Sequence, residues 1–219
     1  MSSGPDTSIV RRSVPVIGIL GGIGSGKSTV VRHVTDLQLE ILDADKIGHE
    51  LLETLAVQEQ VGNAFGTSIF RPDGTIDRSE LAKRVFDPTG AGGRSLKQLE
   101  EILHPAIRRT IHEKIQQASR DVDAFILDAA LLLEAGWAAE CDGLIFIETP
   151  RSIRLERVRK TRGWSEQELS RRESAQWSTE RKREHADFVV DNSGAIDEAA
   201  AQMKQALTSI INRHSHRSS

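Results

Sequence analysis

The chain has 219 residues, of which 38% are apolar and 28% are charged, so one sizeable globular domain with insertions is expected. Its formal net charge of -3 excludes a global attraction to nucleic acid, and its single cysteine, Cys141, excludes an internal disulfide. No window of the sequence approaches the ~18 consecutive apolar residues that a membrane span needs. We therefore expect a soluble cytoplasmic protein without a membrane partner.

The first predicted strand is a short apolar run, Val14–Leu20, which is followed by glycines. Val30, Val31 and Val34 then recur at helical spacing, and Leu39–Leu42 form a second apolar run. Three further strands are predicted between long helical patterns: Phe125–Leu127, Leu144–Ile147 and Phe188–Val190. This alternation favours an α/β fold, a doubly wound parallel sheet of five strands flanked by helices.

A long segment, residues 46–123, separates the second and third predicted strands and is far longer than a simple crossover requires. We expect a mostly helical insertion, with a turn at Arg71–Gly74 and a flexible break at Pro88–Gly93. Ligands of open α/β sheets bind beyond the carboxyl ends of the strands. Because the insertion leaves from such an end, its position favours a role in substrate binding.

A phosphate loop follows the first predicted strand, because Gly21–Ser28 matches the pattern G-x-x-x-x-G-K-[ST]. Its glycines permit backbone N–H groups to converge on phosphate oxygens. Lys27 is expected to reach the β- and γ-phosphates of ATP, and the Ser28 hydroxyl to bind Mg²⁺. The strand before it and the helix after it argue against a simple glycine-rich turn. The residues expected to contact the nucleotide are Gly22, Ile23, Gly24, Ser25, Gly26, Lys27, Ser28 and Thr29.

Two aspartates, Asp43 and Asp45, end the second apolar run. At a strand end, carboxylates two residues apart point to one face, where one could accept the proton of an acceptor hydroxyl. The alternative is that one of them caps the next helix, since Asp is a favoured N-cap residue.

The segment 151–185 holds eleven Lys or Arg residues against six Glu residues. Such a positive excess would suit a polyphosphate ligand. A charge run on helices is also typical of a solvated face with ion pairs four residues apart. Both interpretations stay open for this segment.

Taken together, these motifs resemble the dephospho-CoA kinase family. The resemblance rests on GGIGSGKST, on the Asp-Ala-Asp at Asp43–Asp45, and on a series of later signatures, and it covers about residues 14–210. These signatures are Phe65–Gly66, Asp73–Gly74, Ile76–Arg78, Leu81, Val85–Phe86, Leu103–Pro105, Asp128–Glu134, Arg172, Gln176 and Ala186–Asn192. The resemblance implies a P-loop NTPase fold and transfer of the γ-phosphoryl of ATP to the ribose 3′-hydroxyl of dephospho-CoA, the last step of coenzyme A biosynthesis.

The resemblance also assigns roles to single residues. It implies that Asp45 is the general base, that Lys27 and the lid arginine Arg157 are catalytic, and that Asn192 contacts the nucleotide. Substrate contacts would come from Asp43, His104 and Arg162, with His104 placed at a helix break before Pro105. Asp128 would share Mg²⁺ with Ser28. Glu134 would hold metal-bound water or anchor a lid arginine.

The chain departs from the family pattern at three places. Leu20 replaces a common threonine, Ala130 replaces a common proline, and the arginine spacing near Arg162 differs by one residue from some members. The first two changes remove no group that the chemistry requires. The three tryptophans are too scattered for a stacking platform, so we expect them to serve in packing.

The expected domain plan has a nucleotide-binding core of residues 14–45, 124–150 and 186–213, with 46–123 as the insertion and 151–185 as a basic lid. The polar ends, residues 1–13 and 214–219, lack periodicity and are expected to be tails. The expected partner is dephospho-CoA, with no nucleic acid, and a monomer is expected.

Other functions are less well supported. Other small-molecule kinases share the phosphate loop and a lid, but they lack the aspartate pair and the histidine-proline step. The Asn-Lys-x-Asp motif of a GTPase switch is absent from the sequence. A nucleic-acid function would rest on the basic segment alone, without a recognition motif.

Overall fold

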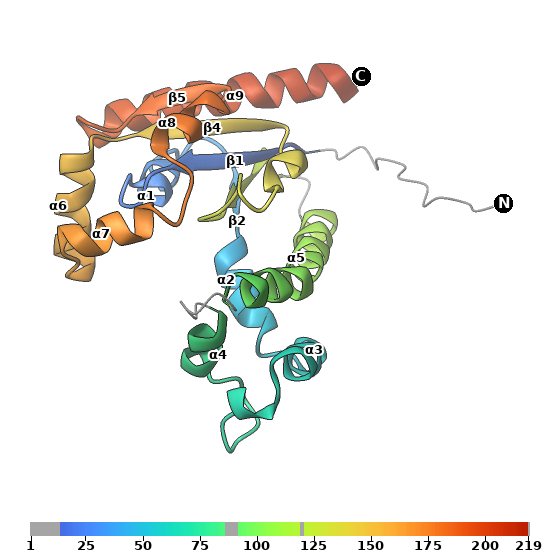
Figure 1. Cartoon of the computed structure of the whole chain (residues 1–219). Helices are drawn as coiled ribbons and strands as arrows, with labels where there is room; N and C mark the ends of the chain where they lie inside the picture. Colours follow the sequence, from blue (N-terminus) through green and yellow to red (C-terminus); the bar gives the residue numbers. More distant parts are fainter. Residues whose placement is uncertain (1–13, 86–91, 119–120, 219) are drawn as a thin grey trace. The chain divides into compact units, whose positions relative to one another are not determined.

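The computed structural model describes residues 14–85, 92–118 and 121–218 (Figure 1). The chain forms two compact units: a core unit of residues up to Ile41 and from residue 119 onward, and an insertion unit, Leu42–Ala118. The insertion unit thus begins and ends earlier than expected. Asp123 exchanges hydrogen bonds with Gln38, which ties the chain before the third strand to the core unit. The predicted tail 1–13 and most of the predicted break at Pro88–Gly93 lie outside the described residues.

The core unit is built on a five-stranded parallel sheet, as the sequence predicted. The strand order is β2-β3-β1-β4-β5, so β1 lies in the centre between β3 and β4. Val16 pairs with Phe125, and Ile17 pairs with Gly143. Every residue of β1 is buried, which explains its uninterrupted apolar sequence. The strands are β1 (Val16–Gly21), β2 (Leu39–Asp43), β3 (Ala124–Asp128), β4 (Gly143–Glu148) and β5 (Phe188–Asp191).

Helices α1 and α9 cover one face of this sheet (Figure 1). Val30 and Val31 of α1 and Met203 of α9 pack with Ile17 and Ile145 in one buried cluster. Helix α8, by contrast, contacts β1. The helices of the core unit are α1 (Lys27–Arg32), η2 (Trp137–Glu140), α6 (Arg151–Arg162), α7 (Glu166–Glu173), α8 (Thr179–Glu184) and α9 (Ile196–Ser218).

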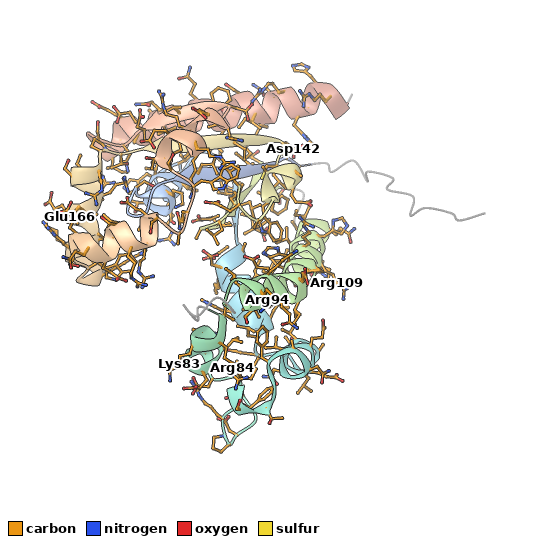
Figure 2. The ribbon with its side chains drawn as sticks, in the orientation of Figure 1. Lys83, Arg84, Arg94, Arg109, Asp142 and Glu166 are labelled. Atoms are coloured by element: carbon orange, nitrogen blue, oxygen red, sulfur yellow. The ribbon has the colours of Figure 1, made fainter. Side chains whose placement is uncertain are left out.

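The predicted C-terminal tail is wrong for residues 214–218, because α9 continues to Ser218. Polar contacts support this end of the helix. His214 Nδ1 lies 3.4 Å from Asp142 Oδ1, and the other oxygen of Asp142 accepts the Val16 N–H at 2.8 Å (Figure 2). Arg213 pairs with Asp187 at 3.7 Å. Apolar periodicity missed the end of this helix because polar contacts support it, with Asp142 and Asp187, which lie just before β4 and β5.

The insertion unit has a hydrophobic core of its own. Val61, Phe65, Ile69 and Leu81 are buried together, and the side chain of Arg84 ties α4 to the end of α3 by donating to the Phe65 carbonyl (Figure 2). The turn predicted at Arg71–Gly74 is present and is closed by a 3.0 Å bond from Gly74 N to Arg71 O. The helices are α2 (Ala44–Leu51), α3 (Leu55–Phe65), η1 (Thr67–Ile69), α4 (Arg78–Val85) and α5 (Gly92–Gln117).

The helix break predicted at His104 is wrong, since α5 runs through Pro105. Proline inside a helix costs about 3 kcal/mol, chiefly through a lost hydrogen bond and a steric clash. Leu103 and Ala106 pack against the insertion core on either side of it. This packing can hold the helix despite the proline. In the described part of the chain, no helix is long and apolar enough to span a membrane.

The insertion core predicts different costs for two apolar truncations. Ile69 is 0% exposed and Leu55 is 84% exposed. We expect Ile69→Ala to lower the free energy of unfolding by about 2 to 5 kcal/mol, because it removes buried methylenes and leaves a cavity. Leu55→Ala should change it by less than about 0.5 kcal/mol. Urea unfolding followed by circular dichroism measures both; equal effects would show that Ile69 does not anchor a packed core.

Candidate active site

Residues 21–28 connect β1 to α1. Glycines are required in this loop because side chains of neighbouring segments approach its backbone closely. Gly24 and Gly26 have φ angles of 78° and 85°, in the left-handed region that favours glycine. A Cβ on Gly26 would lie 2.8 Å from Asn192 Nδ2 and 3.0 Å from Arg157 Nη1. The loop therefore has neither the backbone freedom nor the space for larger residues there.

The Ser25 carbonyl is the point at which the rest of the core unit holds this loop. It accepts hydrogen bonds from Asn192 Nδ2 at 2.7 Å, Arg157 Nη1 at 3.0 Å and Thr149 Oγ1 at 3.0 Å. Asn192 and Thr149 are buried. These three donors come from the ends of β5 and β4 and from α6. They fix the loop backbone from the carbonyl side.

Arg154 is a second support of the loop, and the sequence analysis missed it. Its side chain is 6% exposed; it donates to Ile23 O at 3.2 Å and Thr149 O at 3.1 Å, and it forms an ion pair with Glu173 of α7. Arg151 also binds Glu173, at 3.3 Å. A buried guanidinium needs such partners. Within a basic segment, no sequence signal separates this arginine from its exposed neighbours.

Ser28 and Asp128, the two residues that the sequence analysis assigned to Mg²⁺, form a hydrogen bond. The Ser28 hydroxyl donates a hydrogen bond to Asp128 Oδ2 at 3.0 Å. This bond links the start of α1 to the end of β3. Hydroxyl and carboxylate oxygens are ligands of the type that Mg²⁺ prefers, usually with substrate phosphates. Among the described residues there is no cluster of three or more His, Cys, Asp or Glu suited to a metal.

A small pocket adjoins the loop and contains two lysines. Its walls include Gly21, Lys27 and Ala130, together with Glu134 and Lys182. Sequence analysis considered Glu134 as an anchor for a lid arginine, but its ion-pair partner is Lys182, at 3.3 Å. The role of Lys182 was missed because a lysine within a basic helix gives no sign of burial.

The two predicted lid arginines have different surroundings. Arg157 donates to two main-chain carbonyls, those of Ser25 and Asn192. Arg162 is exposed, and its guanidinium lies 4.7 Å from the ring centroid of Trp164, a cation–π contact. The structure thus brings Arg157 to the loop but gives Arg162 a different contact at the end of α6.

Most of the basic side chains in segment 151–185 have acidic partners. Arg151 pairs with Glu166 at 2.6 Å (Figure 2), and Glu168 binds both Arg171 and Arg172. These two arginines lower the pKa of the Glu168 carboxyl to about 2 by hydrogen bonding to its charged form. The interpretation of this segment as a paired, solvated face therefore accounts for much of its charge.

The predicted acceptor-side residues belong to the insertion unit. Asp43 is the N-cap of α2 and accepts the Lys46 N–H at 2.8 Å, as the capping alternative anticipated. Asp45 is exposed in the first turn of α2. The expectation that both carboxylates share one face of a strand end is wrong, because the helix begins at Ala44.

His104 lies on α5, in the same unit. Partial burial lowers the pKa of its imidazole; Glu100 opposes this shift and Arg108 adds to it. This shift favours the neutral form of the ring, which can donate or accept a hydrogen bond.

A parallel sheet with a phosphate loop after its central strand, and an aspartate from the neighbouring strand beside the loop serine, defines a nucleotide-binding protein of the P-loop NTPase class. The sequence model of the dephospho-CoA kinase family matches residues 15–198. The chain belongs to this family.

Individual relatives agree with this assignment. Dephospho-CoA kinase of Rhodopirellula baltica is 37% identical over 213 residues, which cover 96% of this chain and 98% of the relative. The Aquifex aeolicus enzyme of the same name is 40% identical over 190 residues, 86% of this chain and 94% of the relative. A solved structure from Thermus thermophilus is 31% identical, with a TM-score of 0.76 and coverage of 90% of this chain and 97% of that one.

The crowding at Gly26 predicts that its substitution impairs nucleotide binding. Gly26→Ala should weaken ATP binding about tenfold or more, because the left-handed conformation costs about 1–2 kcal/mol for a residue with a Cβ and because Asn192 and Arg157 must move. Gly163→Ala is the matched control: Gly163 has a φ of 66° and open space around it. Calorimetric titration with ATP measures both, and equal affinities would contradict the role assigned to Gly26.

Proposed function

We propose that this chain transfers the γ-phosphoryl of ATP to the 3′-hydroxyl of the ribose of dephospho-CoA, giving coenzyme A and ADP. The observation that carries the proposal is the phosphate loop with Asp128 beside Ser28, in a chain of the dephospho-CoA kinase family. Kinases of this type rely on positioning and electrostatic stabilisation, since the transferred group needs little covalent help from the protein.

On the donor side, Lys27 would neutralise the β- and γ-phosphates, and Ser28 and Asp128 would hold Mg²⁺. The two oxygen donors, with Ser28 Oγ and Asp128 Oδ2 3.0 Å apart, fit a hard divalent cation that keeps phosphate and water as its other ligands. When bound, Mg²⁺ supplies charge neutralisation at the phosphate oxygens. The remaining backbone N–H groups of the loop would orient the triphosphate.

On the acceptor side, Asp45 would accept the proton of the ribose hydroxyl. Its carboxylate is exposed, in the first turn of α2, where it is accessible to a ligand. Asp43 already caps this helix through one oxygen, so as a substrate contact it would use its remaining acceptor capacity. Neutral His104 would offer a hydrogen bond to the substrate.

Two arginine roles follow from the family resemblance. The catalytic role of Arg157 would require its guanidinium to exchange a loop carbonyl for a phosphate oxygen. Arg162 would have to leave the Trp164 ring to bind substrate. Nucleotide contact by Asn192 would likewise compete with its bond to Ser25 O. A cytoplasmic location and a monomeric state remain predictions.

The choice of acceptor tests this function. A coupled assay of ADP formation should give turnover with dephospho-CoA and none above background with adenosine, AMP or gluconate, and turnover should require Mg²⁺. Turnover with one of the other acceptors alone would overturn the substrate assignment while leaving the phosphate loop intact.

The role of Asp45 predicts a specific loss. Asp45→Asn should lower kcat by about 10²- to 10⁴-fold, because the amide cannot accept the hydroxyl proton, while the circular dichroism spectrum stays unchanged. Glu59→Gln, an exposed carboxylate on α3, is the matched control and should retain full activity. An Asp45→Asn enzyme with normal kcat would exclude Asp45 as the base.

A further inference from the structure

Lys182 of α8 is a buried lysine in the wall of the pocket beside the phosphate loop. Its side chain is 4% exposed. The ammonium nitrogen lies 2.9 Å from Gln176 Oε1, 3.3 Å from Glu134 Oε1 and 3.5 Å from Ala130 O. An ammonium has three N–H donors, and here three protein oxygens surround it. These contacts indicate a group that holds protein segments together rather than one directed at a ligand.

Glu134 is the counter-charge, and it holds a second segment. Its Oε1 accepts the Trp177 N–H at 2.7 Å as well as facing Lys182. Its Oε2 is buried and has no hydrogen-bond partner within the described part of the chain. A buried carboxylate with one unbonded oxygen depends strongly on its remaining partners. Lys182 and the Trp177 N–H are the two polar partners of Glu134 Oε1.

This ion pair belongs to the same strand exit as Asp128. Asp128 ends β3, Ala130 and Glu134 follow it, and the pocket wall contains both of the latter with Lys27 and Lys182. Lys182 thus contacts the strand exit at two places, two and six residues beyond the carboxylate that accepts the Ser28 hydroxyl. Asp128 itself is held in β3 opposite Ile19 of β1, and the ion pair holds the chain that leaves β3 immediately after it.

The charges in the pocket also act on one another. Burial lowers the pKa of Lys182, Glu134 opposes that shift, and the positive charge of Lys27 adds to it. Lys182 and Lys27 therefore lie close enough to repel. Glu134 offsets this repulsion and allows two ammonium groups to share the wall of one pocket.

We propose that Lys182 and Glu134 are positioning residues. They fix residues 128–134, the chain that leaves β3, and so keep the Asp128 carboxylate next to the Ser28 hydroxyl, where both can bind the Mg²⁺ of the nucleotide. The inference rests on the proposed function for its relevance to turnover. Residues that orient a metal ligand from behind typically change metal affinity or activity by about 10- to 100-fold when they are removed.

The test combines the double variant Lys182→Met/Glu134→Gln with thermal unfolding. Removing both charges avoids leaving either one buried alone, so the double variant should fold. The rise in Tm that ATP produces is measured over a series of Mg²⁺ concentrations, relative to the Tm of each protein without ligand. We expect the double variant to need roughly tenfold more Mg²⁺ than the unmodified chain for half of the maximal rise.

Lys160→Met is the matched control, since Lys160 is an ion-paired but exposed lysine, 2.7 Å from Glu156 with 74% side-chain exposure. It should leave the Mg²⁺ requirement unchanged. If the double variant does not fold, Gln176→Leu tests the same group of contacts, because it removes an acceptor of Lys182 and keeps both charges. A roughly threefold or larger rise in the Mg²⁺ requirement is then expected. A folded variant with an unchanged Mg²⁺ requirement would overturn the proposal and leave the pair a role in stability alone.

A kinetic measurement separates positioning from direct contact. The double variant should show an increased KM for ATP at limiting Mg²⁺, with kcat largely recovered at saturating Mg²⁺. Loss of kcat that saturating Mg²⁺ does not restore would overturn the proposal, because the pair would then act on turnover by a route other than Mg²⁺ binding. The thermal readout needs no acceptor, so failure of the unmodified chain to phosphorylate dephospho-CoA would refute the proposed function without deciding this inference.

Discussion

The candidate site depends on how the phosphate loop is held from its carbonyl side. Backbone N–H groups can converge on phosphates only if the carbonyls point elsewhere and are satisfied there. Here one carbonyl, that of Ser25, receives donors from Asn192, Arg157 and Thr149. Arg154 donates a further hydrogen bond to the carbonyl of Ile23, two residues before Ser25 in the loop. Side chains that sequence motifs would assign to ligand binding thus also define the loop itself.

Contacts with the rest of the core unit also position Ser28 and Asp128, the residues proposed to hold Mg²⁺. Ser28 is presented by the first turn of α1, and Asp128 is presented by the end of β3. The register that sets Ile19 opposite Asp128 fixes the level of the aspartate relative to the loop. The ion pair of Glu134 with Lys182 joins the chain after β3 to α8. Arg154, which donates to the Ile23 carbonyl, joins the loop to α7 through its ion pair with Glu173. Two buried basic residues of the segment predicted as a lid, Arg154 and Lys182, are therefore bound to the phosphate loop and to the chain after β3.

The sequence predicts the sheet and the phosphate loop well, for clear physical reasons. A buried parallel strand is apolar throughout, and a phosphate-binding turn needs glycines at fixed positions, so β1 and Gly21–Ser28 can be predicted from the sequence. Long-range polar contacts cannot be predicted in this way. Arg154 and Lys182 look like other basic residues of their helices, and only the fold shows that they are buried. Local rules also failed where packing or capping overrode them, at Pro105 within α5 and at Asp45, which lies in the first turn of α2 rather than on the strand that ends at Asp43.

The most direct test of the account is the ³¹P nuclear magnetic resonance spectrum of the product formed from ATP, Mg²⁺ and dephospho-CoA. The account predicts a new phosphomonoester resonance on the ribose 3′-oxygen, formed in equal amount with ADP. Formation of ADP with only inorganic phosphate, or a phosphate attached at another position, would contradict the claim that this site transfers the γ-phosphoryl to the 3′-hydroxyl.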